Sequence, residues 1–115
     1  MRVALIGSAD FGKAALEAFL DRGDEVVAVF CPPDNPKSSK PEVLKEAAIA
    51  RGLSPLQFAS LKGPEAAQAM IDSQADICVM AYVLQFVPQE LCKIPKHGTI
   101  QYHPSLLPKY RGPSA

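Results

Sequence analysis

Three short, uninterrupted apolar runs constrain the fold of this 115-residue chain more than any other feature. They lie in residues 2–6, 25–30 and 76–83, and each of these segments begins with one charged residue. A continuous apolar run without polar alternation indicates a strand that is buried on both faces, as in a parallel sheet covered by helices. Segments with helical periodicity separate the runs, at residues 13–22 and 64–73 among others. The alternation predicts an α/β fold with a doubly wound parallel sheet.

Polar residues and glycines mark the expected ends of the helices. Asp10 is expected to cap the first helix and Gly23 to end it. The second helix is expected to begin with a capping box, because Ser39 precedes Glu42 by three residues, and to end at Gly52. The residues expected to face the core from the second and third helices are Val43, Leu44, Ala47, Ala66, Ala67, Met70 and Ile71. Residues 56–59 could form a short edge strand, and residues 88–92 one helical turn.

The first turn, residues 7–14, nearly matches the phosphate-binding pattern G-x-x-x-x-G-K-[ST]. Ala14 stands where that pattern needs a hydroxyl to bind Mg²⁺, and the turn also lacks the middle glycine of G-x-G-x-x-G. A nucleotide-binding regulatory domain is therefore a weak alternative. The favoured explanation is structural: Gly7 and Gly12 permit a tight turn and close packing of a helix.

Charge is distributed unevenly although the formal net charge is zero. Residues 1–90 hold eight Lys or Arg against twelve Asp or Glu, whereas residues 91–115 hold four bases and no acid. Such a basic end suits an anionic ligand, or it is simply a solvated edge. The three cysteines lack metal-binding spacing, so we expect no metal and a reducing, cytoplasmic setting. No apolar stretch approaches the ~20 residues that span a bilayer.

The tail combines a short predicted strand, residues 99–102, with a proline-rich loop that follows it. His103 stands at the carboxyl end of this strand, and three prolines within residues 104–113 forbid regular structure. A polar loop leaving a strand is where open α/β sheets bind their ligands. The alternative is that His103 merely caps the end of the strand.

The run at residues 101–112, QYHPSLLPKYRG, resembles the active-site signature of folate-dependent formyltransferases. That family includes methionyl-tRNA formyltransferase, glycinamide ribonucleotide formyltransferase and the hydrolase domain of 10-formyltetrahydrofolate dehydrogenase. The resemblance extends over essentially the whole chain. It implies that residues 1–115 are the N-terminal portion of a formyltransferase catalytic domain with a Rossmann-like fold.

The resemblance also implies the substrate and the site residues. 10-Formyltetrahydrofolate would be the formyl donor, with His103 and Gln101 as catalytic residues; Gln101 stands where many members have asparagine. The folate would bind to Gln85, Phe86 and Val87, in the loop after the strand at residues 76–83, and to Ser105 and Leu107. Phe86 either packs on the pterin or fills the core. A sharp bend at Pro108 suggests a cis bond after Leu107.

The formyl acceptor stays open between water, a tRNA-bound amino acid and a small amine. The loop at residues 31–40 is short and carries only Lys37 and Lys40, which weakens the case for tRNA. The family's orienting aspartate would follow Ala115, so we expect a truncated domain that is inactive as residues 1–115 alone; neither Glu90 nor Asp76 can be assigned as a substitute. A non-catalytic folate-binding module is the alternative.

Overall fold

The computed structural model describes residues 1–102, which form a parallel sheet of four strands. The strands are β1 (Arg2–Gly7), β2 (Glu25–Phe30), β3 (Ile77–Ala81) and β4 (Thr99–Gln101). The helices are α1 (Ala9–Asp21), α2 (Val43–Ala50), α3 (Pro64–Ser73) and α4 (Gln89–Cys92). The strand order is β2-β1-β3-β4 with every pair parallel. The doubly wound α/β prediction is confirmed.

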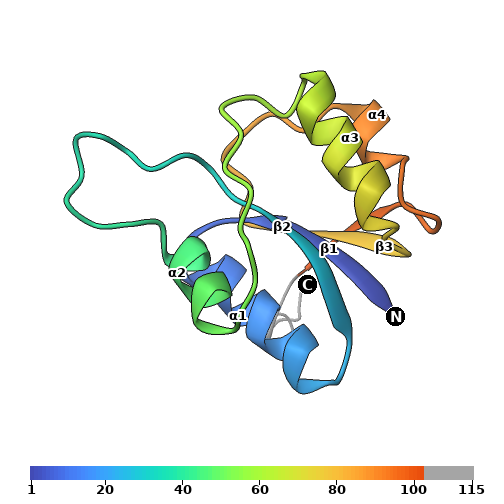
Figure 1. The fold of residues 1–115 in the computed structure, drawn as a ribbon, viewed down its shortest axis with the longest axis horizontal. Helices are drawn as coiled ribbons and strands as arrows, with labels where there is room; N and C mark the ends of the chain where they lie inside the picture. The colour runs from blue at the N-terminus through green and yellow to red at the C-terminus, as the bar shows by residue number, and fades with distance from the viewer. Residues whose placement is uncertain (103–115) are drawn as a thin grey trace, which may run out of the picture.

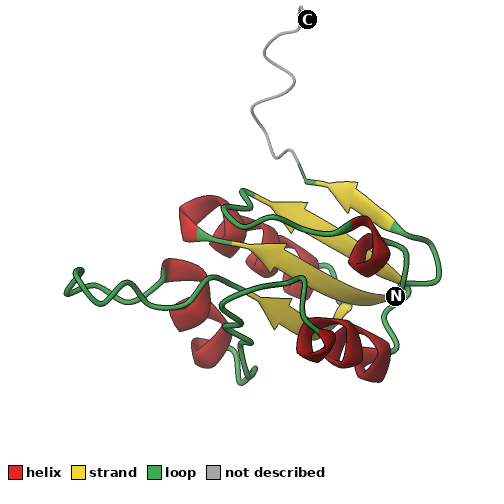
Figure 2. Cartoon of the chain, turned by 90° about the horizontal axis from the view of Figure 1, so that it is seen from above, coloured by secondary structure: helices red, strands yellow, loops and turns green. Residues whose placement is uncertain are grey.

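Helices cover the two faces of the sheet in pairs (Figure 1). On one face α1 and α2 enclose a core that includes Leu5, Leu16, Val29 and Leu44. On the other face α3 and α4 enclose a core that includes Ile6, Phe30, Met70 and Leu91. Neighbouring residues of β1 and β2 therefore enter opposite cores, which explains their uninterrupted apolar runs. Figure 2 shows the sheet between the two helical layers.

The chain reverses its direction of travel across the sheet between β1 and β3. From β1 it moves outward to β2, and then it crosses to the other side of β1 to add β3 and β4. The carboxyl ends of β1 and β3 thus form a topological switch point, the usual ligand-binding position in open α/β sheets.

Helix α1 begins at Ala9, so the prediction that it starts at residue 13 with Asp10 as its cap is wrong. Ser8 occupies the capping position with an extended backbone, and Asp10 lies in the first turn. Gly12 is tolerated inside the helix because its missing side chain makes room for Leu44 of α2: an added Cβ would lie 3.1 Å from the Leu44 Cδ2 atom.

The predicted capping box of the second helix is also wrong. Glu42, not Ser39, is the N-cap of α2, and its own carboxylate accepts a hydrogen bond from the Leu44 amide at 2.7 Å. Because the helix starts at Val43, its buried side chains are Leu44, Ala47 and Ala48, and Val43 is 37% exposed.

Ile71 of α3 does not face the core as predicted, since it is 52% exposed. The buried face of α3 consists of Ala66, Met70 and Ser73, which recur at intervals of one helical turn. Residues 56–59 form no strand; Leu56 makes one isolated parallel bridge to Phe30. No helix within residues 1–102 is long and apolar enough to cross a membrane.

Candidate functional site

A cavity of about 490 Å³ lies at the carboxyl ends of β3 and β4. Its wall consists of Phe11, Met80, Tyr82, Val83, Gln85, Phe86, Val87, Gln101 and Tyr102. These residues come from the first turn of α1, the end of β3, the loop between β3 and α4, and the end of β4. The cavity therefore lies beside the switch point of the sheet.

Four aromatic side chains contribute to this wall: Phe11, Tyr82, Phe86 and Tyr102. The rings of Phe11 and Tyr102 meet edge to face with centroids 6.1 Å apart. Tyr82 is 56% exposed and Phe86 69% exposed, so the alternative that Phe86 fills the core is wrong. Aromatic faces and edges around a hollow suit a flat heteroaromatic ligand.

The loop that leaves β3 starts with a strained residue. Tyr82 has a φ of 58°, in the left-handed region that non-glycine residues rarely adopt. The β1–α1 turn holds it there, because the fully buried Ser8 donates its hydroxyl to the Tyr82 carbonyl and its amide to the Ala81 carbonyl. The left-handed conformation of Tyr82 ends β3 at Ala81, before the predicted end at residue 83. It also directs the following loop over the cavity.

Three consecutive predicted site residues, Gln85, Phe86 and Val87, line the cavity in different surroundings. Gln85 donates its side-chain amide to the carbonyls of Phe58 and Ala59, at 2.9 and 3.4 Å. The Lys62 ammonium lies 5.8 Å from the centroid of the Phe86 ring. Val87 packs partly buried against the core beneath α3 and α4.

Gln101 is the last residue of β4 and pairs in register with Met80. Its exposed side chain lines the same cavity as Gln85, Phe86 and Val87. The pairing continues one residue further, since the Tyr102 amide donates to the Met80 carbonyl at 2.8 Å. His103, Ser105, Leu107 and the bond before Pro108 lie outside the described residues. The functions assigned to all these residues stay predictions.

Asp76 is placed away from this site. It precedes β3 at the amino end of the sheet, where its carboxylate accepts a hydrogen bond from the Arg2 amide at 2.9 Å. This hydrogen bond is the main reason why the pKa of Asp76 is held below its ordinary value. The carboxylate thus joins β1 and β3 at the amino ends of the strands, whereas Gln101 lies at the carboxyl end of β4.

The structure counts against a nucleotide site at the first turn. The Ala9 amide, which opens α1, donates to the Glu42 carboxylate at 2.8 Å. A carboxylate already occupies the position where a phosphate would bind the start of the helix, and it would repel one. Within residues 1–102 no group of three or more His, Cys, Asp or Glu side chains could hold a metal ion.

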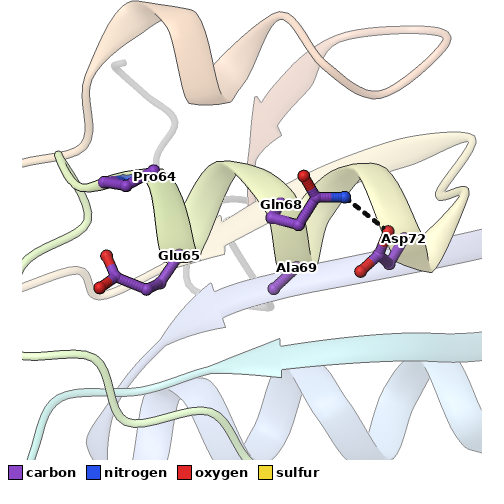
Figure 3. Close-up of a pocket in the computed structure, with 5 residues that line it drawn as sticks. All are labelled: Pro64, Glu65, Gln68, Ala69 and Asp72. Carbon is purple, nitrogen blue, oxygen red and sulfur yellow. Dashed lines mark hydrogen bonds between the residues drawn. The ribbon is translucent and has the colours of Figure 1, made fainter.

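A second hollow lies on the outer face of α3 (Figure 3). It is lined by Pro64, Glu65, Gln68, Ala69 and Asp72, all from that one helix. Gln68 donates to the Asp72 carboxylate at 2.8 Å, which is an ordinary hydrogen bond across one turn of a surface helix. This face therefore has the features of a solvated helix surface.

Sequence reasoning missed five residues of the cavity wall: Phe11, Met80, Tyr82, Val83 and Tyr102. A positional signal was present for four of them. Met80, Tyr82 and Val83 lie in the last half of the third apolar run, at residues 76–83, and Tyr102 is adjacent to Gln101. Phe11 had no such signal, because its contribution depends on α1 beginning at Ala9.

Comparison with known proteins agrees with this architecture. A methionyl-tRNA formyltransferase from Thiobacillus denitrificans is 39% identical over 97% of this chain and 38% of its own length. The cytosolic 10-formyltetrahydrofolate dehydrogenase of Xenopus tropicalis is 38% identical over 100% of this chain and 13% of its own length. This chain thus spans well under half the length of either relative.

Solved structures share the fold. A phosphoribosylglycinamide formyltransferase from Bacillus halodurans superimposes with a TM-score of 0.65 at 22% identity, over 95% of this chain and 59% of that one. The family model described as formyl transferase matches residues 1–115, the whole sequence. The chain therefore belongs to the formyl transferase family.

Proposed function

We propose that the protein transfers or releases the formyl group of 10-formyltetrahydrofolate at the cavity described above. One observation carries the proposal: Gln101 and Tyr102, which line the aromatic cavity at the ends of β3 and β4, are the first two residues of the run 101–112 that resembles the formyltransferase signature. The pterin is a flat heteroaromatic ring, and the cavity offers aromatic side chains together with the side-chain oxygen of Gln85 and the side-chain amide of Gln101. Ser105 and Leu107 complete the predicted folate-binding set.

The reaction is an acyl transfer with defined requirements. A nucleophile attacks the formyl carbon, the carbonyl oxygen gains negative charge, and the nitrogen N10 of the folate leaves with a proton. The Gln101 side-chain amide would donate to the developing oxyanion. His103, whose imidazole has an ordinary pKa near ~6.5, would take a proton from the nucleophile and return one to N10. With water as nucleophile, the products are formate and tetrahydrofolate.

The acceptor is proposed to be water or a small amine rather than a tRNA-bound amino acid. The loop before α2 offers Lys37 and Lys40, whereas Lys45 is paired with Asp34 at 2.7 Å, which raises the pKa of Lys45. Two exposed lysines give little attraction for a polyanion. Because one relative is named for methionyl-tRNA and another for 10-formyltetrahydrofolate, the donor itself, the test includes methionyl-tRNA as well as water as formyl acceptor. Three free cysteines suit a reducing compartment, so we propose the cytoplasm.

The decisive experiment compares wild type with His103→Ala in the full-length gene product. Turnover of 10-formyltetrahydrofolate is expected to fall on the order of 10²–10⁴-fold, the usual contribution of a positioned acid–base group. Affinity for tetrahydrofolate, measured by calorimetry, should change much less. Formate and formylated product are assayed with water alone and with methionyl-tRNA present.

Two control outcomes separate the alternatives. Gln101→Asn, which restores the residue common in the family, should keep activity, whereas Gln101→Ala should lose it. Near-wild-type turnover by His103→Ala would contradict the proposed role of the histidine. Wild type that binds tetrahydrofolate but releases no formyl group would instead establish the non-catalytic folate-binding module.

A further inference from the structure

We propose that Gln85 is a positioning residue: its side-chain amide ties the loop at residues 82–88 to the backbone at residues 58–59, and so fixes one wall of the cavity. The inference rests on the proposed function, because it assigns Gln85 an indirect role in folate binding. The resemblance implies that Gln85 binds the folate, and the inference assigns its side chain an indirect part in that binding.

The donors of Gln85 are already engaged. A glutamine side chain has one NH₂ group and one carbonyl oxygen. The NH₂ group donates to the Phe58 carbonyl at 2.9 Å and approaches the Ala59 carbonyl at 3.4 Å. Only the side-chain oxygen remains to meet a ligand. Direct recognition through the amide would require these bonds to be broken first.

The backbone that receives these bonds is anchored to the sheet. Leu56 donates its amide to the Val29 carbonyl at 2.8 Å, and the Cys31 amide donates to the Leu56 carbonyl at 2.9 Å. Two residues later the Phe58 ring lies 6.2 Å from the ring of Phe30, a fully buried residue of β2. The connection between α2 and α3 therefore offers a fixed attachment point next to the loop that leaves β3 (Figure 1).

The loop itself has little other polar support. Within residues 1–102, no backbone amide of residues 83–87 donates to another backbone group. Ser8 fixes the start of the loop at Tyr82, and α4 fixes its end after Pro88. Gln85 lies between these two points, directly before Phe86 and Val87 of the cavity wall. The hydrogen bonds from Gln85 to residues 58 and 59 thus fix the position of the exposed Phe86 ring.

Loss of the tie should weaken folate binding without changing the chemistry. Gln101 lies on β4 and is held by the sheet, so its position does not depend on Gln85. Gln85→Met, which removes both donor and acceptor at similar length, is expected to raise the KM for 10-formyltetrahydrofolate about threefold to tenfold, the effect of one ordinary hydrogen bond. The value of kcat should stay within about twofold of wild type, and the Kd of tetrahydrofolate should follow KM.

Gln57→Met is the matched control. Gln57 lies in the same connection and also donates its amide twice, to the Pro32 carbonyl at 3.1 Å and to the Asp34 carboxylate at 3.2 Å. It does not line the cavity. Its replacement should leave KM unchanged, although it removes the same kind of bond from the same segment.

Two charged variants separate positioning from direct contact. Gln85→Lys keeps a donor toward the two backbone carbonyls, so positioning predicts a KM near that of wild type. Gln85→Glu keeps the acceptor but sets a carboxylate against those carbonyls, so positioning predicts a raised KM. The opposite ranking, with Glu tolerated and Lys harmful, would show direct contact through the side-chain oxygen and overturn the inference. Equal KM values for all Gln85 variants would overturn it as well.

A second measurement does not need folate. Backbone ¹⁵N order parameters of residues 83–87 are expected to fall in Gln85→Met and Gln85→Glu, but not in Gln85→Lys or Gln57→Met. If wild type neither binds tetrahydrofolate nor turns over the formyl donor, the proposed function fails while this test of the tie still stands. Unchanged order parameters in Gln85→Met would show that the loop is held without Gln85.

Discussion

Gly7 is the residue on which the meeting of β1 and β3 depends most directly. A Cβ added at this position would lie 2.4 Å from the Ala81 carbonyl oxygen, a separation that atoms of a side chain and a backbone do not tolerate. The next residue, Ser8, donates its amide to that same carbonyl at 3.2 Å. The glycine thus lets the two strand ends approach at the switch point, which supports the structural explanation of this turn.

Gly7→Ala is therefore expected to destabilise the protein by about 2–3 kcal/mol, as overpacking against backbone does. Gly52→Ala is the control: its φ of 80° is strained for alanine, but the added Cβ meets nothing within 4 Å. That control should cost about 1 kcal/mol. Urea unfolding of both variants measures the difference, and equal losses would show that the strands separate easily at Gly7.

Glu42 joins two elements through one carboxylate oxygen. This oxygen accepts hydrogen bonds from the Ala9 amide at 2.8 Å and the Leu44 amide at 2.7 Å, at the starts of α1 and α2. Its negative charge also complements the positive ends of both helix dipoles. No short-range pattern predicts this arrangement, because Ala9 and Glu42 meet only after the two helices pack.

At the scale of elements, the amino ends of β1 and β3 are joined by Arg2 and Asp76. The Arg2 guanidinium donates to the carbonyls of Ser73 and Gln74 at the end of α3, at 2.7 and 3.0 Å. The Arg2 amide donates to the Asp76 carboxylate. Backbone and side chain of one residue thus hold a strand, a helix end and the start of the next strand together.

This arrangement predicts a dependence of stability on acid. The Arg2 amide, with a smaller effect from Lys96, lowers the pKa of Asp76 below its ordinary 3.8. Because the pKa of Asp76 is lower in the folded state than in the unfolded state, its ionised carboxylate stabilises the fold when the pH lies above the unfolded-state pKa. This contribution is lost as the pH falls below about 4 and passes through the folded-state pKa. Asp76→Asn should be less stable at pH 6 but should lose less stability between pH 6 and pH 3. An unchanged acid slope in urea unfolding would exclude a contribution from Asp76.

The sequence predicts the elements better than their ends. The strand at Glu25–Phe30 and the helix at Pro64–Ser73 follow from uninterrupted apolar character and from a proline in the first helical turn. The starts of α1 and α2 differ from the prediction because the amides of Ala9 and Leu44, in the first turns of these helices, donate to Glu42, and the bond from Ala9 is a tertiary contact. The outward position of Ile71 was missed because apolarity alone does not define which stripe of a helix packs.

At the scale of the whole molecule, the cavity is assembled from three stretches that are distant in sequence: Phe11, residues 80–87 and residues 101–102. The signature-bearing tail and the loop after β3 could be recognised from sequence, which is how Gln85, Phe86, Val87 and Gln101 were identified as candidates. Phe11 joins them only because the strand order brings β1, and the start of α1 that follows it, beside β3. A wall formed by such convergence has no signal in any single stretch of residues.

Two buried cysteines report on the two helical layers separately. Cys31 belongs to the core under α1 and α2, and Cys78 to the core under α3 and α4. Burial raises the pKa of each thiol to about 12, with the carboxylates of Glu42 and Asp34 adding to the effect at Cys31. Neither thiol should form the reactive thiolate at pH 8 while its layer stays closed.

Labelling with a thiol-specific disulfide reagent at pH 8 should therefore modify Cys92, which is partly exposed, much faster than Cys31 and Cys78. Cys92→Ser should remove this fast phase, and denaturant should make Cys31 and Cys78 react as well. Each slow rate then measures how often one layer opens, because the reagent reaches the thiol only in the open state. If Cys31 reacts as fast as Cys92 in the native protein while Cys78 stays protected, the layer of α1 and α2 opens independently. Only the layer of α3 and α4 then stays stably packed on the sheet.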